Sequence, residues 1–394
     1  MVQADATNRP PSRVRLPNEG VDSGLAAPYL RVEDHDPQTM QTRNAPLCPG
    51  GRRGEAPPVP PIAAAGPSAG VPLYAALDLG TNNCRLLVAS PCGSDSFRVL
   101  DSFSRIIRLG EGLSSTGALS DAAMNRAEAA LEACGQKLAR RPIQVVNAVA
   151  TEACRRATNG PGFMRRAERA LGAPIRVIPA REEAELAMES CAPLLRGEDR
   201  RALLFDIGGG STEVAWVRTD GPDQPRMIGT ISVPLGVVTL VERDGAACFS
   251  ADGFDRVVQE VADRFEAFDG VHRIRQEMRA GGVRLMGTSG TVTTLAGIAL
   301  DLPRYSRAAV DGHELEMDCA DRALEALRLM GREGLAAHPC IGPERVDFVL
   351  PGCAIYAAIR QVWPASRLTV CDRGLREGLL LRAMRSRRRG RRAG

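Results

Sequence analysis

One local pattern occurs twice in this chain and constrains its fold more than any other feature. An apolar run leads to an aspartate and a glycine, polar residues follow, and a second apolar run resumes: YAALDLGTNNCRLLVAS around Asp78 and RALLFDIGGGSTEVAWVRT around Asp206. Each copy predicts two strands joined by a tight glycine turn. Because internal repetition dictates architecture, the two copies predict a pair of related α/β domains that face each other.

Strand-like and helix-like segments alternate after each copy, which is typical of α/β folds. Helical periodicity is found in three segments of the first half, LSDAAMNRAEAALEACGQKLARR, GPGFMRRAERALG and REEAELAMESCAPLL. The second half holds helical patterns in SADGFDRVVQEVADRFEAF, Cys319–Arg332 and VDFVLPGCAIYAAIRQVW. We assign residues 71–186 to the first domain and residues 187–384 to the second.

The two ends of the chain differ from these domains in composition. Residues 1–70 are rich in Pro, Gly, Ala and Arg and lack hydrophobic periodicity. We expect a disordered extension there, because such a segment cannot bury enough apolar surface to fold. Residues 385–394 consist mostly of arginine, and mutual repulsion predicts a disordered basic tail. Weak attraction of this tail to a polyanion is the alternative interpretation.

Composition argues against several function classes. A net charge of only +4 over 394 residues is not typical of a protein that coats nucleic acid. The 11 cysteines form no CxxC pair and the 4 histidines are isolated, which argues against structural zinc. We recognise no signal peptide and no apolar stretch of membrane length. We therefore expect a cytoplasmic protein without membrane or specific nucleic-acid partners.

The glycine turns are the strongest candidates for phosphate binding. Lys137 is the only lysine and no glycine loop precedes it, so a Walker-type phosphate loop is excluded. A glycine turn instead brings backbone N–H groups close to an anion. A third segment, MGTSGTVTTLAG, joins a strand to a helix whose N-terminus attracts anions. The predicted phosphate contacts are Gly80, Thr81, Asn82, Asn83, Arg85, Gly208, Gly209, Gly210, Ser211, Thr212, Gly287, Ser289, Gly290 and Thr291.

The aspartates that precede the two repeated turns predict a metal site. If the turns face each other, Asp78 and Asp206 can share a hard cation, Mg²⁺ or another divalent ion, through oxygen ligands or waters. Any one glycine turn alone is equally typical of an ordinary connection between strands. The repetition of the turn with matching polar residues is what favours a shared site.

The order of these motifs along residues 72–384 resembles the Ppx/GppA family of exopolyphosphatases and guanosine pentaphosphate phosphohydrolases. That family belongs with actin, the sugar kinases and the heat-shock ATPases. The resemblance implies two RNase H-like (actin-like ATPase) domains with the substrate in the cleft between them, and it is compatible with a homodimer. The motifs that carry it are ALDLGTNNCRLLVA, ATEACRRATNG, IPAREEAELA, LLFDIGGGSTEV, MGTSGTVTTLAG, VLPGCAI and DRGLREGLL.

The resemblance also implies residue roles. The family's catalytic base is a glutamate of the EEA segment, which corresponds here to Glu183, and Glu213 is the second candidate for positioning water or metal. Arg155 lies in a segment that lines the cleft in the family and is a predicted phosphate contact. The implied activity is metal-assisted release of terminal phosphate from inorganic polyphosphate, guanosine pentaphosphate or both. From the residues alone, Glu182 and Glu183 are equally typical of a solvated first helical turn.

Two other functions stay open at this point. A small-molecule kinase of the same superfamily would use ATP and would need an adenine pocket and an aspartate that activates the acceptor. A non-catalytic regulator would bind an alarmone nucleotide without turning it over. Phosphate release in the absence of an acceptor separates the hydrolase from both.

Overall fold

The structure is a computed structural model that describes residues 71–93, 96–195, 197–221 and 225–393, with side chains to residue 388. The extension predicted over residues 1–70 lies outside the described residues. Within the described part of the chain, no helix is both long and apolar enough to span a bilayer.

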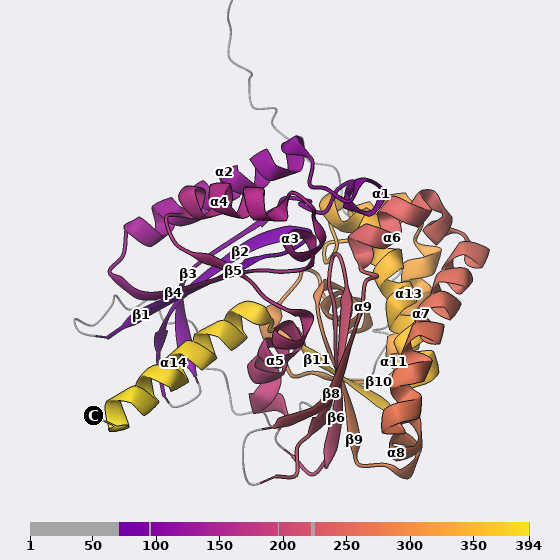
Figure 1. Ribbon diagram of the computed structural model, residues 1–394. Coiled ribbons are helices and arrows are strands. Elements are labelled where there is room, and N and C mark those ends of the chain that lie inside the picture. Colours follow the sequence, from indigo (N-terminus) through magenta and orange to yellow (C-terminus); the bar gives the residue numbers. More distant parts are fainter. Residues whose placement is uncertain (1–70, 94–95, 196, 222–224, 394) are drawn as a thin grey trace, which may run out of the picture. The chain divides into compact units, whose positions relative to one another are not determined.

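The first sheet forms around the first repeated turn. Its five strands lie in the order β3-β2-β1-β4-β5. Helices α2 and α4 cover one face of this sheet and bury a core between them and the strands (Figure 1). The elements are β1 (Leu73–Leu79), β2 (Asn83–Pro91), β3 (Phe97–Ile106), α1 (Leu113–Thr116), α2 (Asp121–Ala139), β4 (Ile143–Ala150), α3 (Glu152–Arg156), α4 (Gly160–Leu171) and β5 (Ile175–Val177).

The second sheet repeats this arrangement. Its order is β10-β11-β9-β6-β7-β8, so β8, β7, β6, β9 and β11 follow one another as β3, β2, β1, β4 and β5 do in the first sheet. The strands are β6 (Arg201–Ile207), β7 (Thr212–Arg218), β8 (Arg226–Val233), β9 (Val283–Thr288), β10 (Glu314–Glu316) and β11 (Arg367–Cys371). The prediction of an α/β fold with two related domains is confirmed.

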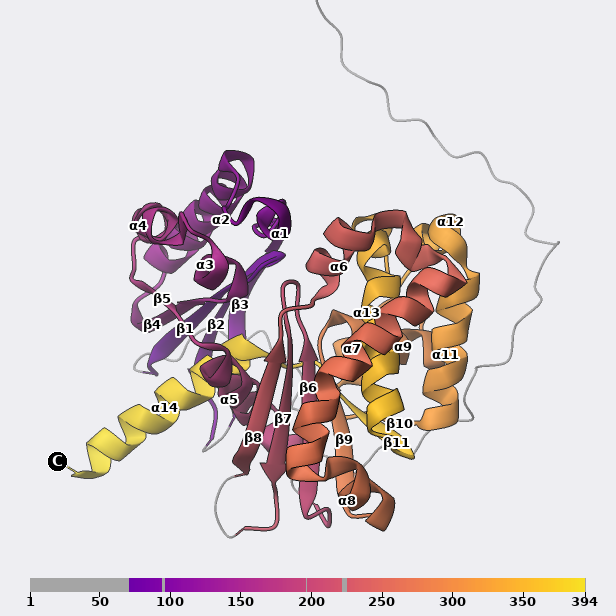
Figure 2. The same cartoon turned by 45° about the vertical axis from the view of Figure 1, so that its right-hand side comes forward.

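Helices α7, α9, α11 and α13 lie against one face of the second sheet (Figure 2). The core between them contains large buried aromatic side chains, among them Phe205, Phe265 and Trp363. The helices of this half are α6 (Val237–Asp244), α7 (Ala251–His272), α8 (Ile274–Ala280), α9 (Gly290–Ala299), α10 (Arg307–Val310), α11 (Met317–Leu329), α12 (Gly331–Ala337) and α13 (Val346–Val362). Short 3₁₀ turns cover Ala192–Leu194, Gly245–Phe249 and Pro343–Arg345.

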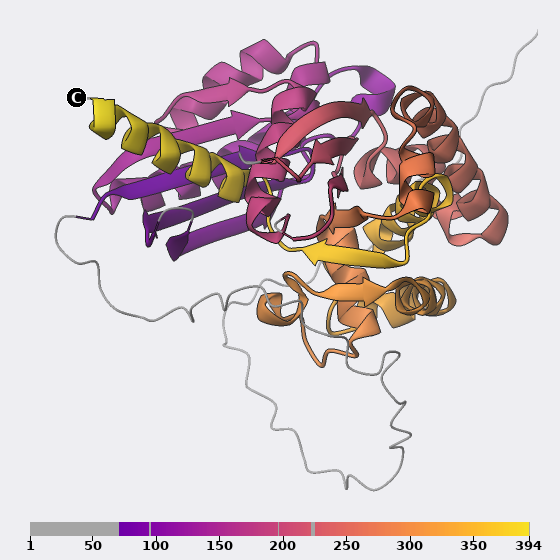
Figure 3. The same cartoon turned by 90° about the horizontal axis from the view of Figure 1, so that it is seen from below.

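Two helices pack against the remaining faces of the sheets and against each other. Helix α5 (Ala180–Cys191) buries Ala187 and Cys191 on the second sheet, whereas α14 (Leu375–Ala393) buries Leu379 and Leu380 on the first. Figure 3 shows α14, in yellow, lying along the first sheet. The predicted domain boundary after residue 186 therefore falls inside α5, and residues 375–384 pack with the first sheet instead of the second. Amphipathic spacing shows that a helix buries one face, but not which sheet receives it.

The backbone of residues 385–393 is helical, whereas the sequence predicts a disordered tail over residues 385–394. The helix begins in a segment that is held by packing on the first sheet, and arginine is a good helix former. Ion pairs near its middle also hold it, because Arg382 contacts Glu189 at 2.6 Å and Glu182 at 3.2 Å. Like-charge repulsion is therefore not sufficient to end the helix at residue 384.

Candidate active site

The two repeated turns have the same backbone geometry. In the first, Gly80 N–H donates to the Asn83 carbonyl at 2.9 Å, and in the second, Gly208 N–H donates to the Ser211 carbonyl at 2.9 Å. The strand register is also the same, because Asp78 lies opposite Arg85 and Asp206 lies opposite Glu213. The repeat thus places an arginine and a glutamate at equivalent positions on the two sides of the site.

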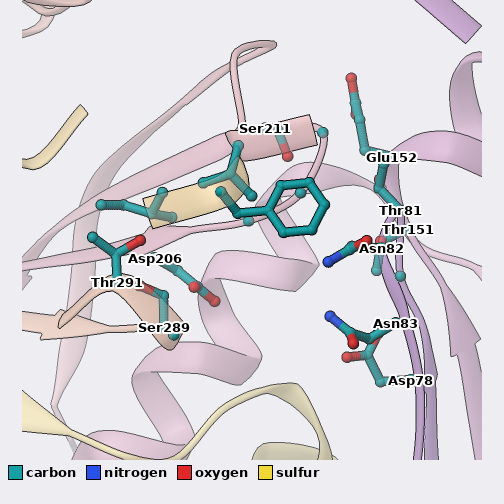
Figure 4. Close-up of a pocket in the computed structure, with 18 of the residues that line it drawn as sticks. Asp78, Thr81, Asn82, Asn83, Thr151, Glu152, Asp206, Ser211, Ser289 and Thr291 are labelled. Atoms are coloured by element: carbon teal, nitrogen blue, oxygen red, sulfur yellow. The ribbon is translucent and has the colours of Figure 1, made fainter. Parts of the chain in front are cut away.

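The two turns approach each other so closely that only glycine fits on one side. A Cβ added to Gly209 would lie 3.2 Å from the Asn82 Cβ, and one added to Gly210 would lie 2.7 Å from the Thr81 Oγ1. Figure 4 shows Asn82 and Asn83 on one wall of the resulting cavity and Asp206 on the other. The glycines of the second turn therefore allow the two halves of the protein to meet.

One cavity brings most of the predicted site residues together. Both repeated turns, the third glycine segment and the start of α5 contribute to its lining. The predicted residues that line it are Asp78, Gly80, Thr81, Asn82, Asn83, Arg85, Glu183, Asp206, Gly208, Gly209, Gly210, Ser211, Ser289, Gly290 and Thr291. Arg155, Thr212, Glu213 and Gly287 are not among its lining residues.

Thr212 and Gly287 lie in the packed interior and do not border the cavity. The Thr212 hydroxyl is buried and donates to the Leu235 carbonyl at 2.7 Å. A Cβ on Gly287 would lie 2.4 Å from the Phe205 ring, so this glycine lets β9 pack beside a core aromatic. Both were predicted from sequence adjacency to the turns. Successive residues of a strand point to opposite faces, however, so Thr212 points away from the face that Ser211 shares with the cavity.

Glu213 lies behind the cavity wall and is 3% exposed. Its Oε1 accepts hydrogen bonds from Ser211 Oγ at 2.7 Å and Ser232 Oγ at 2.8 Å. Burial raises the pKa of this carboxyl to about 7, partly opposed by the Ser211 hydrogen bond. Its negative charge also raises the pKa of Glu183, so the two predicted catalytic glutamates act on each other although only one borders the cavity.

The two adjacent glutamates at the start of α5 have different surroundings. Glu183 borders the cavity, where burial and then the Glu213 charge raise its pKa well above the ordinary value, while Arg155 lowers it. Glu182 pairs with Arg176 at 2.8 Å, and this pairing lowers its pKa. The tertiary structure therefore singles out Glu183 as the member of the EEA pair that faces the cavity.

Asp78 and Asp206 border the same cavity from opposite turns. Burial raises the pKa of Asp206 to about 6, and the Asp78 charge contributes to this rise. Burial likewise raises the pKa of Asp78, while Arg85 and Arg376 lower it. Neighbouring carboxylates that are costly to ionise are typical of sites that receive a cation.

Whether Mg²⁺ fits this site depends on the oxygen atoms that could act as its ligands. Asn82 Oδ1 and Ser289 Oγ are buried without a hydrogen-bond partner among the described residues, and both residues border the cavity. No group of three or more His, Cys, Asp or Glu side chains suited to a metal occurs in the described part of the chain. Mg²⁺ commonly uses only one or two carboxylates together with waters and substrate phosphates, so the available donors fit it.

Sequence reasoning missed several residues of the cavity. Glu152 and the α13 residues Phe348 and Val349 border it, together with Arg345. The Phe348 ring also lies 5.9 Å from the guanidinium carbon of Arg108. An aromatic residue in an apolar helix is typical of a core, so no local signal marks Phe348 as a cavity residue. Glu152 lies within the ATEACRR motif and Val349 within the VLPGCAI motif, and these two motifs were the available indications.

Comparison with known proteins places the chain in a family. Residues 88–387, more than half of the chain, match the model of the Ppx/GppA phosphatase family. The chain is 30% identical over 325 residues to the guanosine-5'-triphosphate,3'-diphosphate pyrophosphatase of Photobacterium profundum. That match covers 79% of this chain but only 59% of the relative's length.

Solved structures share the fold. An exopolyphosphatase-like protein is 29% identical with a TM-score of 0.69, and the match covers 79% of this chain and 97% of that one. A Ppx/GppA family member from Aquifex aeolicus (24% identity, TM-score 0.63) and an exopolyphosphatase from Cytophaga hutchinsonii (22%, 0.69) have the same coverage. The family match over residues 88–387 shows that the chain belongs to the Ppx/GppA phosphatase family.

Proposed function

We propose that this chain hydrolyses the terminal phosphoanhydride bond of inorganic polyphosphate, guanosine pentaphosphate or both, using a water that Glu183 activates. One observation carries the proposal: Glu183, the carboxylates Asp78 and Asp206, and three glycine segments border the same cavity. Membership of a phosphatase family supports this reaction class. Phosphoryl transfer needs little beyond positioning and charge neutralisation, which is what such a cavity supplies.

Backbone N–H groups and one arginine would hold the substrate phosphates. The N–H groups of Gly80 and Gly208 are used within the turns, so the N–H groups that follow them in each turn are the candidates, and Arg85 borders the cavity beside the first turn. Ser289 and Gly290 stand at the N-terminus of α9, a helix of 10 residues whose dipole favours anions. Ser289 has a positive φ of 123°, so its backbone is held in a strained conformation at this point.

Burial raises the pKa of Glu183 well above its ordinary value, which makes its carboxylate a stronger base than an exposed one. The carboxylate takes a proton from water, the water oxygen forms a bond to the terminal phosphorus, and the bond from that phosphorus to the bridging oxygen breaks. The shortened chain leaves with the bridging oxygen and its electron pair. Asp78 and Asp206 would hold Mg²⁺, which supplies charge neutralisation at substrate oxygens when bound.

The experiment is an assay of phosphate release from polyphosphate and from guanosine pentaphosphate, with and without Mg²⁺ and without an acceptor. Glu183→Gln is expected to lower turnover by about 10²–10⁴-fold, the usual range for a lost general base, while substrate binding is largely retained. Glu182→Gln is the matched control, because this neighbour pairs with Arg176 and Arg382 and does not border the cavity.

Each alternative has a distinct result in this assay. A kinase would release no phosphate without an acceptor, and an alarmone-binding regulator would bind the nucleotide with no turnover. If Glu182→Gln loses activity and Glu183→Gln keeps it, the assignment of the base is wrong.

A further inference from the structure

Glu152 borders the cavity but has no part in the chemistry proposed above. It is the first residue of α3 and is 8% exposed. A carboxylate at the wall of a cavity for polyanions would repel the substrate unless cations compensate it. Figure 4 shows Glu152 beside Thr151, on the wall that also carries Thr81. The groups around Glu152 must therefore compensate its negative charge.

Both carboxylate oxygens of Glu152 face arginines. Its Oε2 accepts hydrogen bonds from Arg155 Nε at 3.1 Å and Arg155 Nη2 at 2.5 Å. Its Oε1 lies 3.8 Å from Arg156 Nε. The Glu152 charge is thus compensated within the protein, and two nitrogens of the Arg155 guanidinium are held at one oxygen.

The third nitrogen of the same guanidinium points toward Glu183. Arg155 Nη1 donates to the Ile178 carbonyl at 2.6 Å and to Glu183 Oε2 at 3.4 Å. The guanidinium is planar and rigid, so fixing Nε and Nη2 at Glu152 also fixes the direction of Nη1. One arginine therefore links a cavity-wall glutamate of α3 to the glutamate at the start of α5.

We propose that Glu152 is a positioning residue, which holds the Arg155 guanidinium so that Arg155 in turn orients the Glu183 carboxylate toward the attacking water. The inference rests on the proposed function, in which Glu183 is the base. It also changes the expectation for Arg155, which the sequence predicts as a phosphate contact: in the structure its donors are directed to two glutamates and a carbonyl. Without Glu152, the arginine can turn toward substrate phosphates and leave Glu183 unoriented.

The test measures kcat and KM for Glu152→Ala, Arg155→Ala and the double variant. Glu152→Ala is expected to lower kcat by about 10- to 100-fold, because small displacements of a catalytic group have effects of this size, with KM changed by less than about threefold. If Glu152 acts through Arg155, the double variant is expected to be no slower than Arg155→Ala alone. Glu152→Gln keeps the shape and one acceptor oxygen, so its kcat is expected to fall between those of wild type and Glu152→Ala.

Glu128→Gln is the matched control. Glu128 is a partly buried glutamate of the same half that pairs with Arg166 at 3.0 Å and does not border the cavity. Its loss is expected to leave kcat at the wild-type value. If Glu152→Ala does not fold, as judged by circular dichroism and thermal melting, the isosteric Glu152→Gln carries the same comparison.

Three results would overturn the inference: wild-type kcat in a folded Glu152→Ala, a rise in KM alone, or losses that multiply in the double variant. An inactive Glu183→Gln beside a normal Glu152→Ala would reject only the inference, whereas an active Glu183→Gln would reject the proposed base. A crystal structure of Glu152→Ala adds a readout that does not depend on activity. It is expected to show Arg155 displaced from Glu183, and an unchanged pair would reject the inference whatever the turnover.

Discussion

At the scale of single residues, the site concentrates negative charge that the fold must tolerate. Asp78, Glu183, Asp206 and Glu213 come from β1, α5, β6 and β7, and burial raises the pKa of each. Unfolded, these side chains would ionise near their ordinary values. The folded protein therefore becomes less stable as they lose their protons, which is a typical conflict between stability and function.

Glu213→Gln tests this conflict. The pKa of Glu213 rises from 4.5 to about 7 on folding. Ionised Glu213 therefore lowers the free energy of unfolding, and this effect is absent below the pKa of the unfolded chain and complete above the pKa of the folded protein. In metal-free buffer, the variant is expected to match wild type near pH 4.5 and to be more stable by about 3 kcal/mol above about pH 7. Urea unfolding at several pH values measures this. An advantage that shrinks as pH rises would contradict the assigned direction of the shift.

At the scale of elements, the crossing of α5 and α14 sets where Glu183 stands. A Cβ added to Gly378 of α14 would lie 2.2 Å from the Leu186 carbonyl oxygen and 2.8 Å from its carbon. These are backbone atoms, which cannot move without moving α5. The GLREG part of the DRGLREGLL motif therefore includes a glycine that the contact between two helices requires.

Gly378→Ala is expected to displace α5 and with it Glu183. Overpacking of this kind costs about 1–3 kcal/mol of unfolding free energy, and displacement of the proposed base should lower kcat by about tenfold or more. Gly270→Ala in α7 is the control, because nothing lies within 4 Å of its added Cβ. That change should stabilise the protein by about 0.5–1 kcal/mol, as alanine does in a helix. Unchanged kcat in Gly378→Ala would show that α14 does not set the position of the base.

At the scale of the whole molecule, the site exists only where the two halves meet. Each half has its own core, one around α2 and α4 and the other around α7 and α13. The halves meet where α5 packs on α14, with Leu186 of α5 buried beside Leu379 and Leu380, and through polar contacts such as Gly112 N–H to Glu242 Oε1 at 2.6 Å. Catalysis should consequently depend on this meeting more strongly than folding does.

Gly210→Ala is expected to lower turnover strongly while changing the stability of the fold little. Its Cβ would lie 2.7 Å from Thr81 Oγ1 and 3.1 Å from Glu152 Cγ, so these two cavity side chains must shift or the turns must move apart. Turnover should fall by about tenfold or more, because a displacement of about 1 Å is enough, while unfolding free energy should change by less than about 1 kcal/mol. Gly162→Ala in α4, where the added Cβ meets nothing within 4 Å, should leave turnover at the wild-type value and raise the unfolding free energy by at most about 0.5–1 kcal/mol. A large loss of stability with normal turnover would contradict the expectation that catalysis depends on the contact between the halves more than folding does.

Local chemistry made much of this protein predictable from its sequence. Whether a turn can form at Gly80 or Gly208 depends on the glycine and its immediate neighbours, so the repeated turns and the strands around them could be predicted. The carboxylates Asp78 and Asp206 follow, because the residue before such a turn lies at the edge of its sheet. Glu183 was found through the resemblance of its motif, and the structure places it in the same cavity.

Only the tertiary structure decided which distant side chains meet. The link from Glu152 through Arg155 to Glu183, the place of Phe348 at the cavity and the packing of α14 on the first sheet all join segments far apart in the chain. Thr212 and Gly287 were predicted from their adjacency to the turns, and only the fold shows that Thr212 donates to the Leu235 carbonyl and that Gly287 makes room for the Phe205 ring. Backbone turns are determined by short-range sterics, whereas burial and charge pairing are properties of the assembled fold.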